Sequence, residues 1–129
     1  MKIIILDDSI TIRMIIESFL EELGVDEDNI YSFAEGSKAM EFIQTNGADI
    51  VFSDINMPDM SGFEFAELVF KIAPKLQRTF FAISGSENRE AYQKMKSIGV
   101  HHFMKKPIKL GYFKHFVLPE ILRIRSQSN

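Results

Sequence analysis

The sequence predicts an α/β fold in which a five-stranded parallel sheet is covered by helices on both faces. Short apolar segments alternate along the chain with longer segments whose apolar residues recur at helical spacing, and five such pairs follow one another. This alternation is typical of successive βαβ units, whose strands are parallel. The runs IIIL, IVF and FFAI are continuously apolar, which is typical of central strands buried on both faces.

The predicted strands are the five short apolar segments. Polar residues within NIYSF and HHFMK indicate that the second and fifth strands lie at the edges of the sheet. In chain order the predicted strands are Ile3–Leu6, Ile30–Phe33, Asp49–Ser53, Thr79–Ile83 and His102–Met104.

Each predicted strand is followed by a segment with helical periodicity. In the first, apolar residues from Ile12 to Leu23 recur at three- and four-residue spacing, and Gly24 follows where a helix usually ends. Pro119 interrupts the last stripe, so we expect the last helix to kink there or to restart with Pro119 in its first turn. The other stripes run over Ala39–Ile43, Phe65–Ile72, Ala91–Ile98 and Phe113–Ile124.

Length and composition bound the class of protein. The 129 residues fit one domain, which we place at residues 1–125, followed by a frayed tail at 126–129. The absence of cysteine excludes a disulfide scaffold and fits a reducing compartment. A net charge of −3 argues against a nucleic-acid binder, and no apolar run approaches the roughly 20 residues of a membrane span. We therefore expect a soluble, cytoplasmic protein.

Polar side chains capable of chemistry follow four of the five strands. Asp7 and Asp8 follow the first strand, Asp54 the third, Ser84 the fourth and Lys106 the fifth. Because the carboxyl ends of parallel strands meet at one edge of the sheet, we expect these five side chains to gather there. Three carboxylates so close together repel one another unless a cation or a proton offsets their charge.

The chemistry of this set points to a hard divalent cation and a phosphoryl group. Carboxylate oxygens and a phosphate are ligands that Mg²⁺ prefers, and Mn²⁺ is the substitute we would expect. A carboxylate beside such an ion and a lysine can attack a phosphoryl group, forming an aspartyl phosphate. Ser84 and Lys106 would then hold two of the phosphoryl oxygens.

These residues stand in four short motifs spread along the chain: LDDS at 6–9, SDINMPDMSG at 53–62, ISG at 83–85 and KKP at 105–107. Together, in this order and spacing, they resemble the receiver domains of two-component response regulators, a family that includes the stand-alone chemotaxis regulators. This resemblance covers essentially the whole chain and implies a doubly wound, flavodoxin-like sheet with strand order 2-1-3-4-5.

The resemblance also implies a role for each site residue. Asp54 matches the phosphoacceptor, and Lys106 matches the phosphate-binding lysine. Asp8 would ligate the metal directly together with Asp54, while Asp7 would act through a bound water. Asn56 would ligate the metal through its backbone carbonyl.

Three further positions match the family's switch and loop features. Ser84 and Phe103 match the switch hydroxyl and the switch aromatic residue, and the bond between Lys106 and Pro107 should be cis. Ser86 is smaller than the residue that many relatives carry there, which leaves the lifetime of the phosphoryl group open.

The function implied is that of a single-domain response regulator. A sensor histidine kinase or a phosphotransfer protein would phosphorylate Asp54, and the change would alter a protein-binding face made by the last two helices and the last strand. We expect a monomer before phosphorylation, no enzyme activity beyond its own phosphorylation and dephosphorylation, and a protein as the output partner. Chemotaxis and other phosphorelays both fit.

Other readings of the same residues remain. An aspartate-nucleophile phosphatase would usually need a second aspartate at the position of Asn56. A flavin-binding carrier would need a phosphate loop rich in serine, threonine and glycine after the first strand. A protein-interaction module independent of phosphorylation is a further alternative. We interpret His101 and His102 as solvated edge residues rather than as metal ligands, and Asp59 as a turn or surface residue.

Overall fold

The protein forms one five-stranded parallel sheet with the strand order β2-β1-β3-β4-β5. The computed structural model describes residues 1–85 and 88–127. The predicted fold class and strand order are therefore confirmed. The strands are β1 (Ile3–Leu6), β2 (Ile30–Phe33), β3 (Ile50–Asp54), β4 (Phe80–Ser84) and β5 (His102–Lys105).

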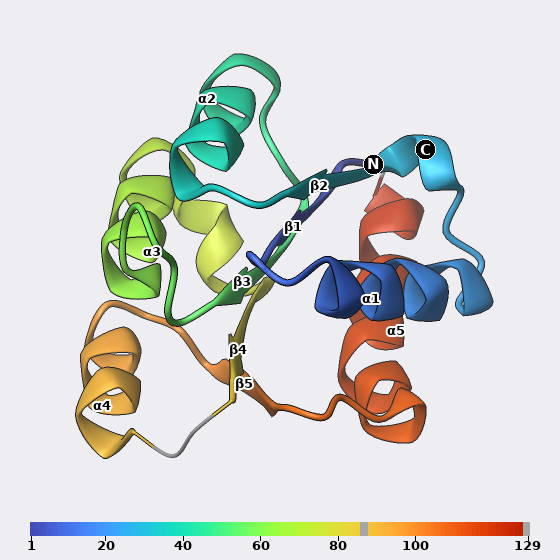
Figure 1. Ribbon diagram of the computed structural model, residues 1–129. Helices are drawn as coiled ribbons and strands as arrows, with labels where there is room; N and C mark the ends of the chain where they lie inside the picture. Colours follow the sequence, from blue (N-terminus) through green and yellow to red (C-terminus); the bar gives the residue numbers. More distant parts are fainter. Residues whose placement is uncertain (86–87, 128–129) are drawn as a thin grey trace.

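Helices cover both faces of the sheet, with α2, α3 and α4 on one face and α1 and α5 on the other (Figure 1). Two separate clusters of buried apolar side chains fill the spaces between the sheet and these layers. The helices are α1 (Ile10–Glu22), α2 (Gly36–Asn46), α3 (Gly62–Ile72), α4 (Arg89–Ser97) and α5 (Leu110–Gln127), with short 3₁₀ helices η1 (Glu27–Asn29) and η2 (Pro74–Gln77).

The burial of the strands follows the sequence pattern. Every residue of β1, β3 and β4 is buried, whereas β2 and β5 at the two edges are only partly buried. Apolar side chains on both sides of the three central strands can therefore pack against helices, which explains why these strands are almost continuously apolar. No described helix has the length and apolar character needed to cross a membrane.

The last helix excludes one of the two alternatives predicted at Pro119, and it extends further than predicted at its end. α5 continues through Pro119 and does not restart there. Pro119 and His115 both lie on the exposed side of the helix, so water can reach the carbonyl that the proline leaves without an amide donor. The helix also includes residues 126 and 127, which were expected to form part of a frayed tail, and the Ser126 hydroxyl donates to the Arg123 carbonyl there. Residues 128–129 lie outside the described part of the chain.

Candidate functional site

Three aspartates meet at the carboxyl end of the sheet, as predicted. Asp7 and Asp8 follow β1, and Asp54 is the last residue of β3. One carboxylate oxygen from each lies within 4.8 Å of the others. Asp7 and Asp54 are buried whereas Asp8 is exposed, so the cluster opens to solvent on the side of Asp8.

Lys106 brings one positive charge into this cluster. Its Nζ atom lies 3.1 Å from Asp7 Oδ2 and 3.3 Å from Asp54 Oδ2. The backbone amide of Lys106 donates to the Ser84 carbonyl at 2.8 Å, which fixes the lysine beside the end of β4. The peptide bond between Lys106 and Pro107 is cis, as the resemblance implied.

The electrostatics of the cluster leave an excess of negative charge. Burial raises the pKa of Asp54 above its ordinary value, and the Asp7 carboxylate adds to this effect; the Asn56 amide and the Lys106 ammonium oppose it. Burial alone would lower the pKa of Lys106, but the carboxylates of Asp54 and Asp7 outweigh it and raise that pKa. One ammonium thus faces two buried carboxylates, with Asp8 as a third acid beside them.

The donor set fits a hard divalent cation. Asp7 Oδ2 is buried and has no hydrogen-bond donor among the described residues, although it forms an ion pair with Lys106. Its Oδ1 atom accepts from the Ser9 amide, which fixes the orientation of the carboxylate. A set that contains only oxygen ligands, with a buried carboxylate oxygen whose one charged neighbour is shared with Asp54, suits Mg²⁺ better than a softer metal. Asp8, Asp54 and the Asn56 carbonyl are the groups that would hold it, with Asp7 acting through water.

The remaining predicted residues lie around this cluster. Ser84 is buried at the end of β4, and the Asn56 amide donates to Asp54 Oδ1 at 3.1 Å. Phe103 lies further off on β5, half-buried, with its ring centroid 5.1 Å from that of Tyr92 on α4. The Tyr112 hydroxyl of α5 donates to the Phe103 carbonyl, so this residue contacts both flanking helices. Ser86 lies outside the described residues.

Asp59 has a structural role that the sequence interpretation missed. Its carboxylate accepts from the amides of Gly36 and Ser37 at 3.0 and 2.9 Å, and these bonds lower the pKa of Asp59. Glu35 stands at the N-cap of α2 but makes no side-chain cap bond, so Asp59 replaces it from a loop 23 residues away in sequence. The missing cap residue before α2 is the only signal that the sequence offered.

The prediction that both histidines are solvated is wrong for His102. His102 is half-buried, and its ring stacks on Phe81 with a centroid distance of 4.6 Å. Burial lowers the pKa of His102 below its ordinary value, against an opposing effect of the nearby Glu120 carboxylate. His101 is exposed, as expected. The strand pattern could not indicate that Phe116 of α5 would lie near His102, with a centroid distance of 6.3 Å.

The doubly wound sheet and the acidic cluster at its carboxyl end are features of a receiver domain. The chain belongs to the response regulator receiver domain family, which it matches over residues 3–117. Receiver domains are signalling domains of two-component systems rather than enzymes in their own right. They interact with histidine kinases or phosphotransfer proteins, and they typically bind Mg²⁺ at an acidic pocket.

Individual relatives agree with this family. The chain is 26% identical over 113 residues to a probable chemotaxis protein CheY of Rhizobium etli, covering 88% of this chain and 86% of that protein. It is also 26% identical over 113 residues to the autoinducer 1 sensor kinase/phosphatase LuxN of Vibrio campbellii, covering 88% of this chain but only 13% of that protein.

Solved structures are similar as well. The chemotaxis protein CheY4 of Vibrio cholerae superposes with a TM-score of 0.75 at 28% identity, covering 95% of this chain and 96% of that one. A CheY-like receiver domain protein of Methanospirillum hungatei has a TM-score of 0.83 at 21% identity, covering 99% of this chain and 98% of that one, and supports the fold alone.

Proposed function

We propose that the chain is a response regulator whose Asp54 accepts a phosphoryl group in the presence of Mg²⁺. The observation that supports this most directly is the partial neutralisation of Asp54. A single Lys106 ammonium lies 3.3 Å from it and is shared with Asp7. Such an arrangement leaves room for both a cation and the negative charge of a phosphoryl group.

The proposed reaction is a transfer to a carboxylate oxygen. An Asp54 oxygen attacks the phosphorus of a phosphohistidine or an acyl phosphate. The new P–O bond makes a mixed anhydride, and the bond between phosphorus and the donor's leaving group breaks. Bound Mg²⁺ would offset charge on the phosphoryl oxygens. Lys106 moves from its ion pairs to a phosphoryl oxygen, and the Ser84 hydroxyl donates to another. Asn56 lies beside Asp54, where its exposed side chain can meet the water that later hydrolyses the anhydride.

The proposed output is a change on the face formed by α4, β5 and α5. Phosphorylation would draw Ser84 and the loop after β4 toward Asp54, and the ring of Phe103 would follow. Phe103 is suited to report this movement because it contacts Tyr92 of α4 and accepts from Tyr112 of α5. A kinase or phosphotransfer protein is the proposed donor, and a protein bound at this face is the proposed recipient.

The test is phosphorylation by acetyl phosphate with and without Mg²⁺. We expect a mass increase of about 80 Da, one added PO₃H, that requires the metal and is absent from Asp54→Asn. The matched control is Asp59→Asn, which removes an acid from the same loop without touching Asp54. An adduct that persists in Asp54→Asn, or no adduct under any condition, would contradict the proposal. The second result would favour an interaction module that works without phosphorylation.

A further inference from the structure

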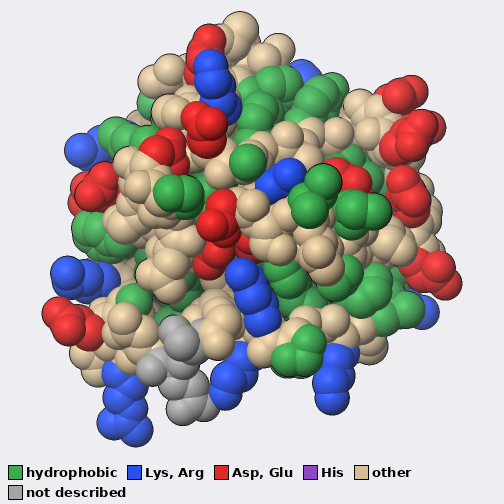
Figure 2. Space-filling view, viewed as in Figure 1, with side chains coloured by type: hydrophobic (Ala, Val, Ile, Leu, Met, Phe, Trp, Pro, Cys, Tyr) green, Lys and Arg blue, Asp and Glu red, His purple; other side chains and the backbone are tan. Residues whose placement is uncertain are grey.

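Charge is divided unevenly along the chain. Residues 1–67 contain 15 of the 18 acidic residues but only three of the 15 basic ones, whereas residues 68–129 contain three acidic and 12 basic residues. Acidic side chains gather near the right edge of Figure 2, over α1 and η1, and basic side chains along its lower edge, over α4 and α5. A net charge of −3 therefore conceals a strongly basic side of the molecule.

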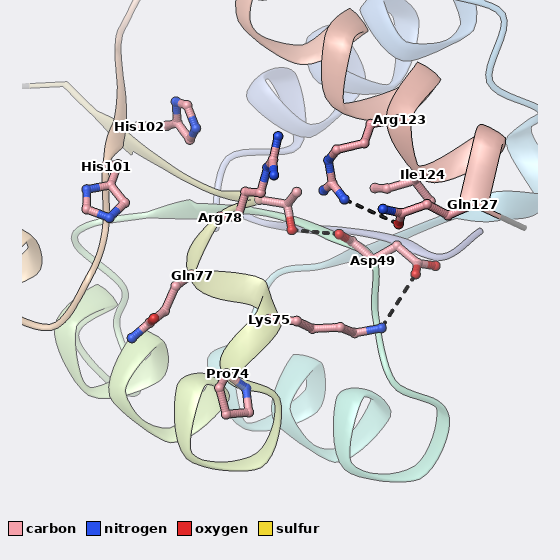
Figure 3. Close-up of a pocket in the computed structure, with 11 residues that line it drawn as sticks. Asp49, Pro74, Lys75, Gln77, Arg78, His101, His102, Arg123, Ile124 and Gln127 are labelled. Atoms are coloured by element: carbon pink, nitrogen blue, oxygen red, sulfur yellow. Dashed lines mark hydrogen bonds and ion pairs between the residues drawn. The ribbon is translucent and has the colours of Figure 1, made fainter.

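Basic residues from the second half of the chain also line a cavity of about 570 Å³ at the amino end of the sheet, the end opposite Asp54. Figure 3 shows the residues that line this cavity. Lys75, Arg78 and Arg123 supply three positive charges to its lining. Figure 3 shows Arg78 and Arg123 reaching the same region from the start of β4 and from α5. Asp49 offsets one charge only weakly, because its carboxylate lies 3.9 Å from Lys75 Nζ and also accepts from the Lys2 amide.

The two arginines share a single carboxylate. Arg78 Nε and Arg123 Nε each lie 2.9 Å from the same oxygen of Glu120, which is buried. All side-chain hydrogen bonds of Arg78 to the described residues come from its Nε atom, and its side chain is 64% exposed. Because a guanidinium has five N–H donors, the terminal nitrogens of Arg78 are available for a second carboxylate.

A second cavity, of about 320 Å³, adjoins the first. His101 and His102 line both cavities, and the second is otherwise mainly aromatic, with Phe103, Tyr112 and Phe116 in its lining. We call the two cavities together the basic–aromatic groove. Its basic end lies beside Arg78, and its aromatic end lies on the face formed by α4, β5 and α5. Tyr112 is 49% exposed, so the aromatic end is accessible.

We propose that the basic–aromatic groove binds an acidic segment of a partner protein, with carboxylates at Arg78 and Lys75 and an apolar side chain against Tyr112 and Phe116. An extended polypeptide can contact both ends at once, whereas a compact polyanion would use only the basic end. Arginine pairs well with carboxylates, and aromatic side chains are frequent anchors at protein interfaces. The inference rests on the proposed function only in taking the aromatic end as part of the output face.

The test is a titration of the unphosphorylated 129-residue chain, followed by two-dimensional amide NMR. The probe is a synthetic peptide with a run of glutamates followed by a phenylalanine and a leucine; a matched peptide has glutamine in place of glutamate. We expect the acidic peptide to shift the amides of His101 and His102, and Lys75→Glu, Arg78→Gln and Tyr112→Ala each to weaken binding about tenfold. Lys38→Glu, an equal charge reversal on α2, should leave the affinity unchanged.

Other outcomes would overturn the proposal. Equal binding of the glutamine peptide would remove the role of charge, and equal loss in Lys38→Glu would reduce the effect to net charge. If pyrophosphate binds as tightly as the peptide and shifts only the amide signals at the basic end, the cavity would be assigned to a small polyanion instead. The absence of any binding would also overturn it. Since the titration needs no phosphorylation, its failure is distinguishable from a failure of Asp54 to accept a phosphoryl group.

Discussion

The two ends of the sheet carry charge clusters in which the numbers of positive and negative groups are reversed. At the carboxyl end, one Lys106 ammonium lies between two buried carboxylates, those of Asp7 and Asp54. Near the amino end, one buried Glu120 carboxylate lies between two guanidinium groups, those of Arg78 and Arg123. The first cluster lacks positive charge and the second lacks negative charge. The same fold thus combines an excess of negative charge at one end of the sheet with an excess of positive charge at the other.

Loss of the Lys106 ammonium from the acidic cluster should have the greatest consequence. In Lys106→Met we expect phosphorylation by acetyl phosphate to slow about 100-fold, because no ammonium is left to stabilise the transferring phosphoryl group. Intact-protein mass spectrometry over time measures the rate. The control is Lys105→Met at the adjacent, exposed position, which should change the rate less than about twofold. A rate that survives the loss of Lys106 would show that the acidic cluster works without its lysine.

The corresponding change at the other end is Glu120→Gln. It leaves two guanidinium groups facing each other without the carboxylate, and we expect the free energy of unfolding to fall by about 1–2 kcal/mol. The effect is limited because the Arg78 side chain is largely exposed. Urea unfolding measures it, with the exposed Glu67→Gln on α3 as the control. If both variants unfold at the same urea concentration, the pairing at Glu120 contributes nothing to stability.

The two clusters also differ in how far the sequence could predict them. The acids of the carboxyl end directly follow strands or end them, so the strand pattern alone brings Asp7, Asp8 and Asp54 together. Arg78, Glu120 and Arg123 come from a loop and a helix whose relative rotation depends on side-chain packing, and no local pattern links them. For the same reason the cap that Asp59 provides to α2 was missed: its two amide donors lie in a different βα unit.

Acid titration tests the environment of His102 near the amino end of the sheet. Its ring lies between Phe81 and Phe116, and the charged or titratable groups that act on it are Glu120, Arg78 and His101. Because the folded protein lowers the pKa of His102, the unfolded chain takes up the proton first as the pH falls below about 6.5. The stability contributed by the neutral ring is complete above that pH and is lost as the pH falls toward the folded-state pKa.

Unfolding in urea at several values between about pH 7.5 and pH 5.5 measures this effect. We expect His102→Gln to have a flatter pH dependence than the unmodified chain. The exposed neighbour supplies the control: His101→Gln should keep the original slope, because no comparable burial acts on that ring. Parallel slopes in all three proteins would mean that carboxylates alone account for the loss of stability in acid.

The smallest expected effect separates two kinds of acid at the carboxyl end: those that face the proposed cation site, and Asp59, which caps a helix. Asp59→Ala removes both acceptors for the amides of Gly36 and Ser37, and we expect a loss of about 0.5 kcal/mol, reduced from a typical cap because the carboxylate is exposed. Since the native bonds lower the pKa of Asp59, their contribution is complete above the unfolded-state pKa and disappears as the pH falls through the folded-state value. The loss of stability in Asp59→Ala should therefore be seen in urea unfolding at neutral pH and vanish in acid.

Asp59→Asn, which retains one acceptor, should have a stability between those of Asp59→Ala and the unmodified chain. Phosphorylation of Asp54 should proceed at the original rate in both variants; a slower rate would mean that the cap also positions the loop that carries Asn56, and the two kinds of acid would then belong to one site.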